Sequence, residues 1–588
     1  MGMLRYFRLG LGLQTLYLSL LFICFFVVVS ETSKSEKPNV LFIVIDDLRP
    51  ALGCFDDRIL TPNIDQLAQQ SVIFTQAYVQ QAVCAPSRIS FLTSRRPDTT
   101  KLYNFKSYWR TFAGNFTTLP QHFKENGYFA ASVGKVMHPG KASGGNDDYP
   151  YSWSIPAYHP PTQLNKTSKV CENPDGTLHE NLICPVDVAK MPGKSLPDIQ
   201  STDHAIEIIK NISKLTKTSK NFTQPFFLAV GYHKPHVPFK YPKEYEELYP
   251  LDSIWMPPNN FFPPDLPTVA WEPYQMMRTR EDVQSWNISY PFGPVPLKYQ
   301  RLIRQNYFAA TSYMDYEVGR LLSELEKAGF ADNTIISFKG DHGWQLGEHE
   351  EYSKFSNFKE ATRVPLFFHI PGVTTKKHRK WGEAFPLINP LKDTKLREKH
   401  LKRLADWMAP TKPSQSSKLT TDAFVELVDL FPTLAELAGL RVPPTCPPKP
   451  FKIDFCTEGT SLVPVINQVT KTKPSNIIQW KNATFSQYPR PSDYPCPLTD
   501  LSPLQNITIM GYSMQTSKYR YTEWIGFDSS NFRQNWNDVH ARELYMMDTD
   551  EQENYNVANQ ESSKELVKEL SGILKAGWRS SLPIFKKN

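Results

Sequence analysis

The sequence is poor in glycine and lacks the motifs of several large enzyme classes. Only 27 of its 588 residues are glycine, below the usual share of ~7%, and no collagen repeat or coiled-coil pattern is present. It contains no G-x-x-x-x-G-K-S/T, no G-x-G-x-x-G and no G-x-S-x-G, the signatures of phosphate-binding loops, dinucleotide-binding folds and serine hydrolases. The absence of C-x-x-C argues against zinc ribbons and thioredoxin-type chemistry.

Charge of one sign is also scarce. The chain has 66 Lys and Arg against 59 Asp and Glu, a formal net charge of +7. This excess is too weak to indicate nucleic acid as a partner, but it is compatible with a polyanionic substrate. Hydrophobic residues make up 40% of the chain and charged residues 21%, which excludes global disorder and allows a sizeable core. Proline accounts for 49 of the 588 residues, above its usual share of ~5%. This excess predicts many stiff loops.

The N-terminus has the pattern of a secretory signal. Arg5 and Arg8 precede an apolar run from Leu16 to Val29, and Ser30 offers a small residue for cleavage. We therefore expect residues 1–30 to be a signal peptide, with an uncleaved signal anchor as the alternative. No later segment approaches the ~18 uninterrupted apolar residues of a membrane span. Export agrees with seven N-x-S/T triplets, at Asn115, Asn165, Asn211, Asn221, Asn287, Asn482 and Asn506.

The cysteines suggest two local disulfides. Of eight cysteines, Cys24 lies in the signal, and two pairs are close in sequence: Cys171 with Cys184, and Cys446 with Cys456. An oxidising lumen favours these pairings. Cys54, Cys84 and Cys496 are left over, and Cys84 needs an explanation of its own.

Four short apolar runs predict an α/β fold. They do not alternate between polar and apolar residues, which is typical of strands buried on both faces of a mostly parallel sheet. Helical patterns at 64–71, 202–212 and 313–328 alternate with them. Ionisable residues follow each run, where open α/β sheets bind their ligands. The runs are 40–45 before Asp46-Asp47, 129–133 before Lys135 and His138, 226–230 before His233 and His236, and 334–338 before Asp341-His342.

The remainder of the chain predicts a second, smaller unit. The basic stretch 374–418 reads as a solvated surface loop, with a contact for an acidic polymer as the alternative. Residues 424–440 read as an apolar helix interrupted near Pro432. The proline-rich segment 443–448 then marks a boundary, which divides a catalytic domain at 31–445 from a C-terminal subdomain at 446–588. Within that subdomain, residues 562–578 are amphipathic and helical in pattern.

The segment around Cys84 carries the chemistry. Cys84-Ala85-Pro86-Ser87-Arg88 suggests a helix that begins just after Cys84, and a helix N-terminus favours an anion. The alternative is a buried structural cysteine. The segment resembles the sulfatase signature C-x-P-S-R, followed at the proper spacing by Leu92-Thr93-Ser94-Arg95, where the family's L-T-G-R has Gly in place of Ser94. The resemblance implies that a formylglycine-generating enzyme oxidises Cys84 to formylglycine.

The same resemblance assigns a site across the chain and implies an alkaline-phosphatase-like sulfatase fold. It implies metal ligands at Asp46, Asp47, Cys84, Asp341 and His342, where many sulfatases have Asn instead of His342. It implies catalytic roles for Arg88, Lys135, His138, His236 and Lys354. Carboxylate oxygens independently favour a hard cation, and the family favours one Ca²⁺ per chain over Mg²⁺. Hydrated formylglycine would attack the sulfur of a sulfate ester, with His236 as the acid for the leaving oxygen and His138 as the base.

The resemblance also suggests a substrate and a compartment. It is greatest for the family branch that acts on terminal 2-O-sulfated iduronic acid in heparan and dermatan sulfate. Arg49 and Trp344, which follow the two metal elements, are the candidate contacts for the sugar. The branch implies the lysosome, with secretion as the alternative. Two other functions stay open: a hydrolase of another sulfated sugar or of a phosphodiester, and a catalytically silent glycosaminoglycan-binding glycoprotein.

Overall fold

The computed structural model describes residues 37–173, 175–219, 223–376, 382–406, 411–413, 417, 419–470 and 477–585. The chain divides into two units, Met1–Pro38 and Asn39–Asn588, and everything below concerns the second. The expected signal peptide and the triplet at Asn221 lie outside the described residues. No described helix is long and apolar enough to cross a membrane.

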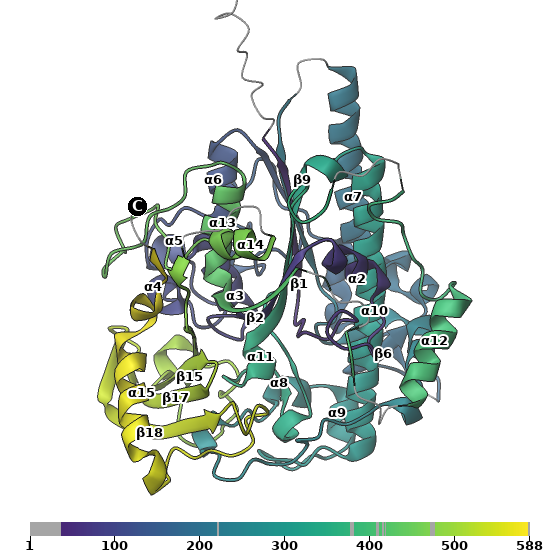
Figure 1. The fold of residues 1–588 in the computed structure, drawn as a ribbon. Coiled ribbons are helices and arrows are strands. Elements are labelled where there is room, and N and C mark those ends of the chain that lie inside the picture. Colours follow the sequence, from purple (N-terminus) through teal and green to yellow (C-terminus); the bar gives the residue numbers. More distant parts are fainter. Residues whose placement is uncertain are drawn as a thin grey trace, which may run out of the picture. The chain divides into compact units, whose positions relative to one another are not determined.

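A seven-stranded mixed sheet forms the centre of this unit (Figure 1). The four predicted strands are confirmed, and they are neighbours, in the order β9, β1, β7, β3, all parallel. The antiparallel strand β12 joins them to β2, which pairs in parallel with β13. The strands are β1 (Asn39–Ile45), β2 (Val72–Tyr78), β3 (Phe129–Gly134), β7 (Phe226–Tyr232), β9 (Thr334–Gly340), β12 (Arg363–His369) and β13 (Thr420–Glu426).

Helices cover both faces of the sheet (Figure 1). The side chains of β1 show why, since Val40, Phe42 and Val44 point into one apolar cluster while Leu41, Ile43 and Ile45 point into another. A strand buried on both faces reads as an unbroken apolar run. One cluster includes residues of α3 (Cys84–Thr93), α6 (Leu119–Glu125), α13 (Leu430–Leu437) and α14 (Val463–Thr470), and the other includes residues of α2 (Pro62–Gln69), α7 (Pro197–Thr218) and α10 (Leu297–Lys327).

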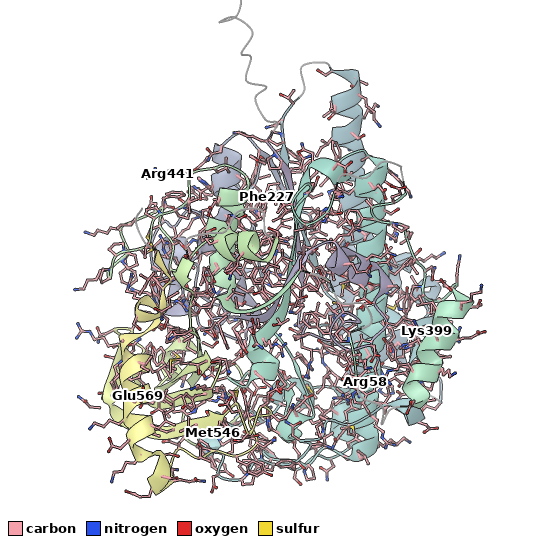
Figure 2. The ribbon with its side chains drawn as sticks, in the orientation of Figure 1. Arg58, Phe227, Lys399, Arg441, Met546 and Glu569 are labelled. Carbon is pink, nitrogen blue, oxygen red and sulfur yellow. A yellow bond between two sulfur atoms is a disulfide. The ribbon has the colours of Figure 1, made fainter. Side chains whose placement is uncertain are left out.

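The C-terminal part of the chain adds a four-stranded antiparallel sheet (Figure 1). Its strands are β15 (Ala483–Arg490), β16 (Ile509–Thr516), β17 (Tyr519–Asp528) and β18 (Arg533–Met546). The amphipathic helix expected at 562–578 is present as α15 (Lys564–Ala576), and Leu570 and Leu574 bury its apolar side in a cluster with residues of this sheet. Side chains fill the space between the ribbons throughout (Figure 2).

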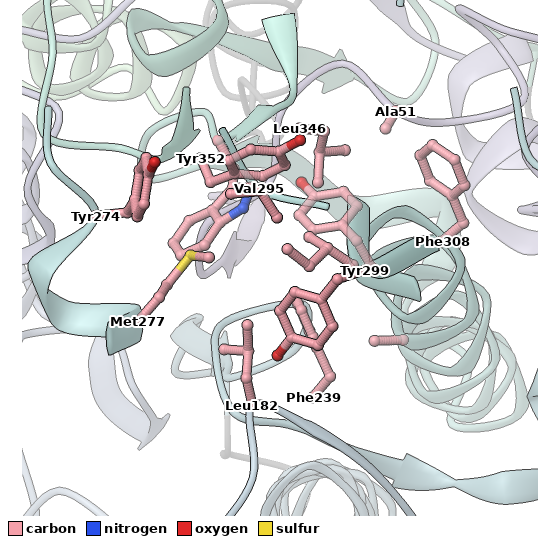
Figure 3. Close-up of a cluster of buried hydrophobic side chains, with 14 of the residues drawn as sticks. Ala51, Leu182, Phe239, Tyr274, Met277, Val295, Tyr299, Phe308, Leu346 and Tyr352 are labelled. Carbon is pink, nitrogen blue, oxygen red and sulfur yellow. The ribbon is translucent and has the colours of Figure 1, made fainter. Parts of the chain in front are cut away.

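A third apolar cluster packs the long loops together (Figure 3). Tyr274, Met277 and Tyr299 come from the segment between β7 and β9, and they pack with Tyr352 and with Trp524 of β17. The long, proline-rich connections are therefore not loose. They form a core of their own, which gives the loops around the strand ends fixed positions.

Several local expectations can be compared with the structure. Both disulfides, Cys171–Cys184 and Cys446–Cys456, are confirmed. The helix expected over 424–440 is partly wrong, because Phe424 belongs to strand β13 and Pro432 lies in the first turn of α13, where proline is tolerated. The basic stretch 374–418 contains the helix α12 (Thr394–Ala405). The boundary at 445/446 stays a prediction.

Gly231 is a position where the strand packing allows no side chain. A Cβ atom there would lie 2.1 Å from the backbone carbon and oxygen of Lys135. We expect Gly231→Ala to lower the free energy of unfolding by about 1–3 kcal/mol, because the backbone of β3 must move. The matched control is Gly572→Ala in α15, where a Cβ atom meets nothing within 4 Å and helix propensity should add about 0.5–1 kcal/mol. Denaturant unfolding measures both, and equal effects would contradict this account.

Candidate active site

Four parallel strands bring the candidate residues to one edge of the main sheet. The hydrogen-bond ladder continues one residue past the strand ends: the N–H of Asp46 donates to the Tyr232 carbonyl at 3.1 Å, and the N–H of Asp341 donates to the Ile45 carbonyl at 3.0 Å. The N–H of Lys135 donates to the Gly231 carbonyl at 2.8 Å. These backbone hydrogen bonds fix the positions of the residues that follow the strand ends, so side chains far apart in sequence meet there.

Arg88 lies at the centre of this edge and is fully buried. Its Nε donates to Asp341 Oδ2 and its Nη2 to Asp46 Oδ1, both at 2.9 Å. Its Nη1 donates to the carbonyls of Lys135 and Val136. One guanidinium thus joins the ends of β1, β9 and β3. Removing it would leave two buried carboxylates with an uncompensated charge, which typically costs about 3–5 kcal/mol.

Cys84 is the first residue of α3 and its side chain faces this cluster. Its Sγ lies 3.2 Å from Lys354 Nζ, 3.3 Å from His342 Nε2 and 3.7 Å from Lys135 Nζ. Burial and the charge of Asp46 raise the pKa of the thiol to about 12, although both lysines oppose the shift. An unmodified thiol here stays protonated at physiological pH and is a poor nucleophile.

Three aspartates form a pocket that fits a divalent cation. Donor atoms of Asp46, Asp47, Cys84 and His236 lie within 4.8 Å of one another, and so do those of Asp46, Cys84, Asp341 and His342. Asp47 has a positive φ of 59°, and its Oδ2 is buried without a hydrogen-bond partner in the described structure. A buried, unsatisfied carboxylate oxygen among further carboxylates suits the oxygen coordination of Ca²⁺ or Mg²⁺.

The three aspartates differ in their pKa values. Burial and the charge of Asp46 raise the pKa of Asp47 to about 6 and that of Asp341 to about 7, although nearby cationic side chains oppose the shift. Burial acts on Asp46 in the same direction, but the charges of Lys135 and Arg88 outweigh it and hold its pKa well below the usual range. The ion pairs of Asp47 with Lys354 and of Asp341 with Arg88 do not offset this rise, and a bound cation would add the positive charge that lowers both pKa values.

The two candidate histidines flank the cluster. His236 Nε2 lies 3.9 Å from Asp46 Oδ2 and 3.8 Å from Asp47 Oδ2. The His138 ring stacks on Phe105 with 4.3 Å between ring centroids. Burial and the charge of Lys135 lower the pKa of His138 to about 2 and hold that of His236 well below its usual value. Both imidazoles are therefore neutral before an anionic ligand arrives.

The two expected sugar contacts have other partners in the structure. Arg49 Nη1 donates to Glu348 Oε2 at 3.0 Å and to the Trp344 carbonyl at 3.1 Å. Trp344 is only 1% exposed. A role for either side chain in substrate binding stays a prediction, and it would require the Arg49–Glu348 pair to open.

Sequence reasoning did not identify a group of lysines beside the site. Lys166, Lys234 and Lys240 line a cavity together with Asp46, Lys135 and His236. Lys240 Nζ donates to the carbonyls of Asn165, Lys166 and Ser168, so it holds the loop in place. No hydrogen bond or ion pair of the Lys166 ammonium occurs within the described part of the chain, and burial lowers its pKa to about 8. No motif in the sequence around Lys166 indicates that its side chain lies beside the candidate active site.

Comparisons with known proteins agree with this geometry. The family model "Sulfatase" matches residues 38–440. The chain is 49% identical to iduronate 2-sulfatase of Homo sapiens over 570 residues, which cover 95% of this chain and 98% of that protein. It is 50% identical to the Mus musculus iduronate 2-sulfatase over 530 residues, covering 90% and 92%. A phosphonate monoester hydrolase from Silicibacter pomeroyi shares the fold, with a TM-score of 0.62 and 19% identity over 93% of this chain and 96% of that one.

The carboxylate pocket leads to a test of cation binding. Ca²⁺ added to chelator-treated protein should raise the unfolding temperature, since a ligand at 100 times its Kd adds about 2.7 kcal/mol. Asp47→Asn should abolish most of this shift, because it removes the unsatisfied oxygen. The control is Asp252→Asn, an exposed carboxylate outside the cluster. A full Ca²⁺ shift in Asp47→Asn would show that this pocket is not the binding site.

Proposed function

The chain belongs to the sulfatase family, and from this membership we propose that it hydrolyses the 2-O-sulfate ester of terminal iduronic acid in heparan and dermatan sulfate. As a sulfatase it is a sulfuric ester hydrolase, with an alkaline-phosphatase-like fold. The substrate is inferred from the identity of about half of all residues, nearly end to end, with iduronate 2-sulfatases. The convergence of the signature residues on the Cys84 side chain supports the activity.

The reactive group is proposed to be formylglycine made from Cys84. Its hydrate supplies an oxygen nucleophile that a thiol at this position cannot, and it releases sulfate by returning to the aldehyde. Because Cys84 is 1% exposed in the folded chain, a formylglycine-generating enzyme would have to act before α3 packs against the sheet. The expected order is therefore translocation, oxidation and then folding.

The surrounding residues have separable tasks in this proposal. Lys354 and Lys135 present ammonium groups within 3.2 and 3.7 Å of the side chain at position 84 and would hold the sulfate oxygens. Arg88 fixes the two carboxylates. His236 would deliver a proton to the departing sugar oxygen and His138 would accept one. A cation held by Asp46, Asp47, Asp341, His342 and the side chain at position 84, which we propose is Ca²⁺ in preference to Mg²⁺, would make the nucleophile more acidic.

A lumenal location fits the structure. Two disulfides are present, which favours the secretory pathway. Among the described N-x-S/T triplets, Asn165 is half-buried and five asparagines are exposed: Asn115, Asn211, Asn287, Asn482 and Asn506. We propose delivery to the lysosome, with secretion as the alternative.

The decisive experiment compares substrates. Wild-type protein should release sulfate from a 2-sulfated iduronide and leave a 6-sulfated glucosamine and a phosphodiester nearly unchanged. Cys84→Ser should lose turnover, by about 10³-fold or more, but keep its unfolding temperature. The hydroxyl is smaller than the thiol, and a sulfate ester formed on serine has no second hydroxyl group that could expel sulfate by forming an aldehyde. Peptide mass spectrometry should find residue 84 about 18 Da lighter than cysteine. Multiple turnover by Cys84→Ser, or a preference for another substrate, would refute the proposal.

A buried carboxyl group gives a pH prediction. Glu272 is fully buried, and burial with the charges of Asp500 and Glu351 raises its pKa well above 4.5. The folded state therefore binds a proton that the unfolded chain has lost, so stability falls as the pH rises above 4.5. Glu272→Gln should reduce this fall between pH 5 and 7, whereas Glu569→Gln, at an exposed position of α15, should not. Identical pH profiles of unfolding for the two variants would contradict the assignment.

A further inference from the structure

One surface helix presents a row of unpaired lysines. Lys395, Lys399 and Lys402 of α12, together with Lys392 just before it, are all exposed. The spacing of four and three residues places the helical three on one side, over about 10 Å of helix. Lys399 extends away from the body of the protein in Figure 2. In the part of the chain that the structure describes, none of the four makes a hydrogen bond or ion pair through its ammonium.

The other side of α12 holds it firmly in place. His400 and Leu404 are buried, and the His400 ring bonds to the Leu248 carbonyl at 2.9 Å. Arg397 pairs with Glu247 at 2.7 Å and Arg403 with Asp57 at 3.0 Å. The basic groups of the helix thus divide into arginines that anchor it and lysines that face solvent. Asp393, which caps the helix by accepting from the Leu396 N–H, and Glu398 and Asp406 are the acidic residues beside the row.

The position of α12 connects this row to the active site. Arg403 contacts Asp57 in the loop that begins with Asp46 and Asp47. The next residues line an open cavity, in which Arg58 stacks over the Trp255 ring at 4.0 Å and Arg49 and Arg304 contribute further guanidinium groups. Carboxylates balance the arginines of this cavity, since Arg58 pairs with Asp56 at 2.7 Å and both Arg49 and Arg304 pair with Glu348. The helix α12 is therefore joined to the loop that leads to the site, and the lysine row supplies the positive groups that have no acidic partner among the described residues.

We propose that the lysine row of α12 is a secondary binding surface for the sulfated polysaccharide whose terminal sugar enters the active site. The inference rests on the proposed function, which makes that substrate a chain with sulfate and carboxylate groups along its length. Exposed lysines bind such a chain through weak, salt-screened contacts. They would raise the local concentration of long substrates without touching the reacting sugar.

The chain offers a matched control patch. Lys210, Lys214 and Lys217 of α7 and Lys327 of α10 are exposed and line one shallow groove. They lie at the opposite edge of the main sheet, because α7 ends there before β7 begins (Figure 1). Two variants with the same charge change can therefore be compared: Lys→Gln at 392, 395, 399 and 402, and Lys→Gln at 210, 214, 217 and 327. Glutamine preserves helix propensity in both.

The test combines binding and turnover. The α12 variant should elute from immobilised heparin at lower NaCl than wild type and than the α7 variant. Because exposed ion pairs are individually weak, its KM for long heparan chains should rise about five- to ten-fold at low salt, and the difference should vanish at high salt. Its kcat/KM on a 2-sulfated iduronide disaccharide should equal that of wild type.

Two results would overturn the proposal. Equal shifts in the NaCl concentration of elution for the two variants would mean that the net charge of the protein alone explains heparin binding. An unchanged elution, or an unchanged KM for long chains, in the α12 variant would exclude α12 as a binding surface. The proposed function is tested separately. If wild type hydrolysed no 2-sulfated iduronide, that function would fail, while the heparin elution would still decide whether α12 binds sulfated polysaccharide.

Discussion

The charge network around Arg88 is the constraint on which the site depends. A guanidinium without solvent contact holds Asp46 and Asp341 from two strands and the carbonyls that follow a third. Its fixed, planar set of donors allows one residue to hold several acceptors, which a lysine could not do. Because each partner lies one or two residues past a strand end, the position of Arg88 and the register of the sheet determine each other.

Burial of this network shapes its chemistry. The aspartates, lysines and histidines lie where water cannot screen them, so small differences in environment separate their pKa values. Burial holds the thiol at position 84 neutral, which makes it a poor nucleophile as it stands. The proposed oxidation to formylglycine would supply an oxygen nucleophile in its place. The orphaned oxygen of Asp47 shows where the pocket lacks positive charge, and a divalent cation would supply it.

The proposed recognition of a large anionic substrate would involve other parts of the fold. The reacting ester meets a cluster of fixed charges at the sheet edge, whereas Lys166 and α12 come from long connections between core elements. Such connections can vary without disturbing the strands. The firm packing of these loops in their own apolar core would let their charges act from defined positions.

The sequence by itself determined the parts that local patterns encode. Short, mostly apolar runs without alternation predicted the four parallel strands, close cysteine spacing predicted both disulfides, and the segment from Cys84 to Arg95 indicated the family. Only the tertiary structure decided what depends on contacts distant in sequence. It placed Phe424 in a strand because β2 was available as a partner, buried Trp344, and brought Lys166 beside Asp46. No local pattern carries that information, since these neighbours are chosen by packing and charge compensation across the whole fold.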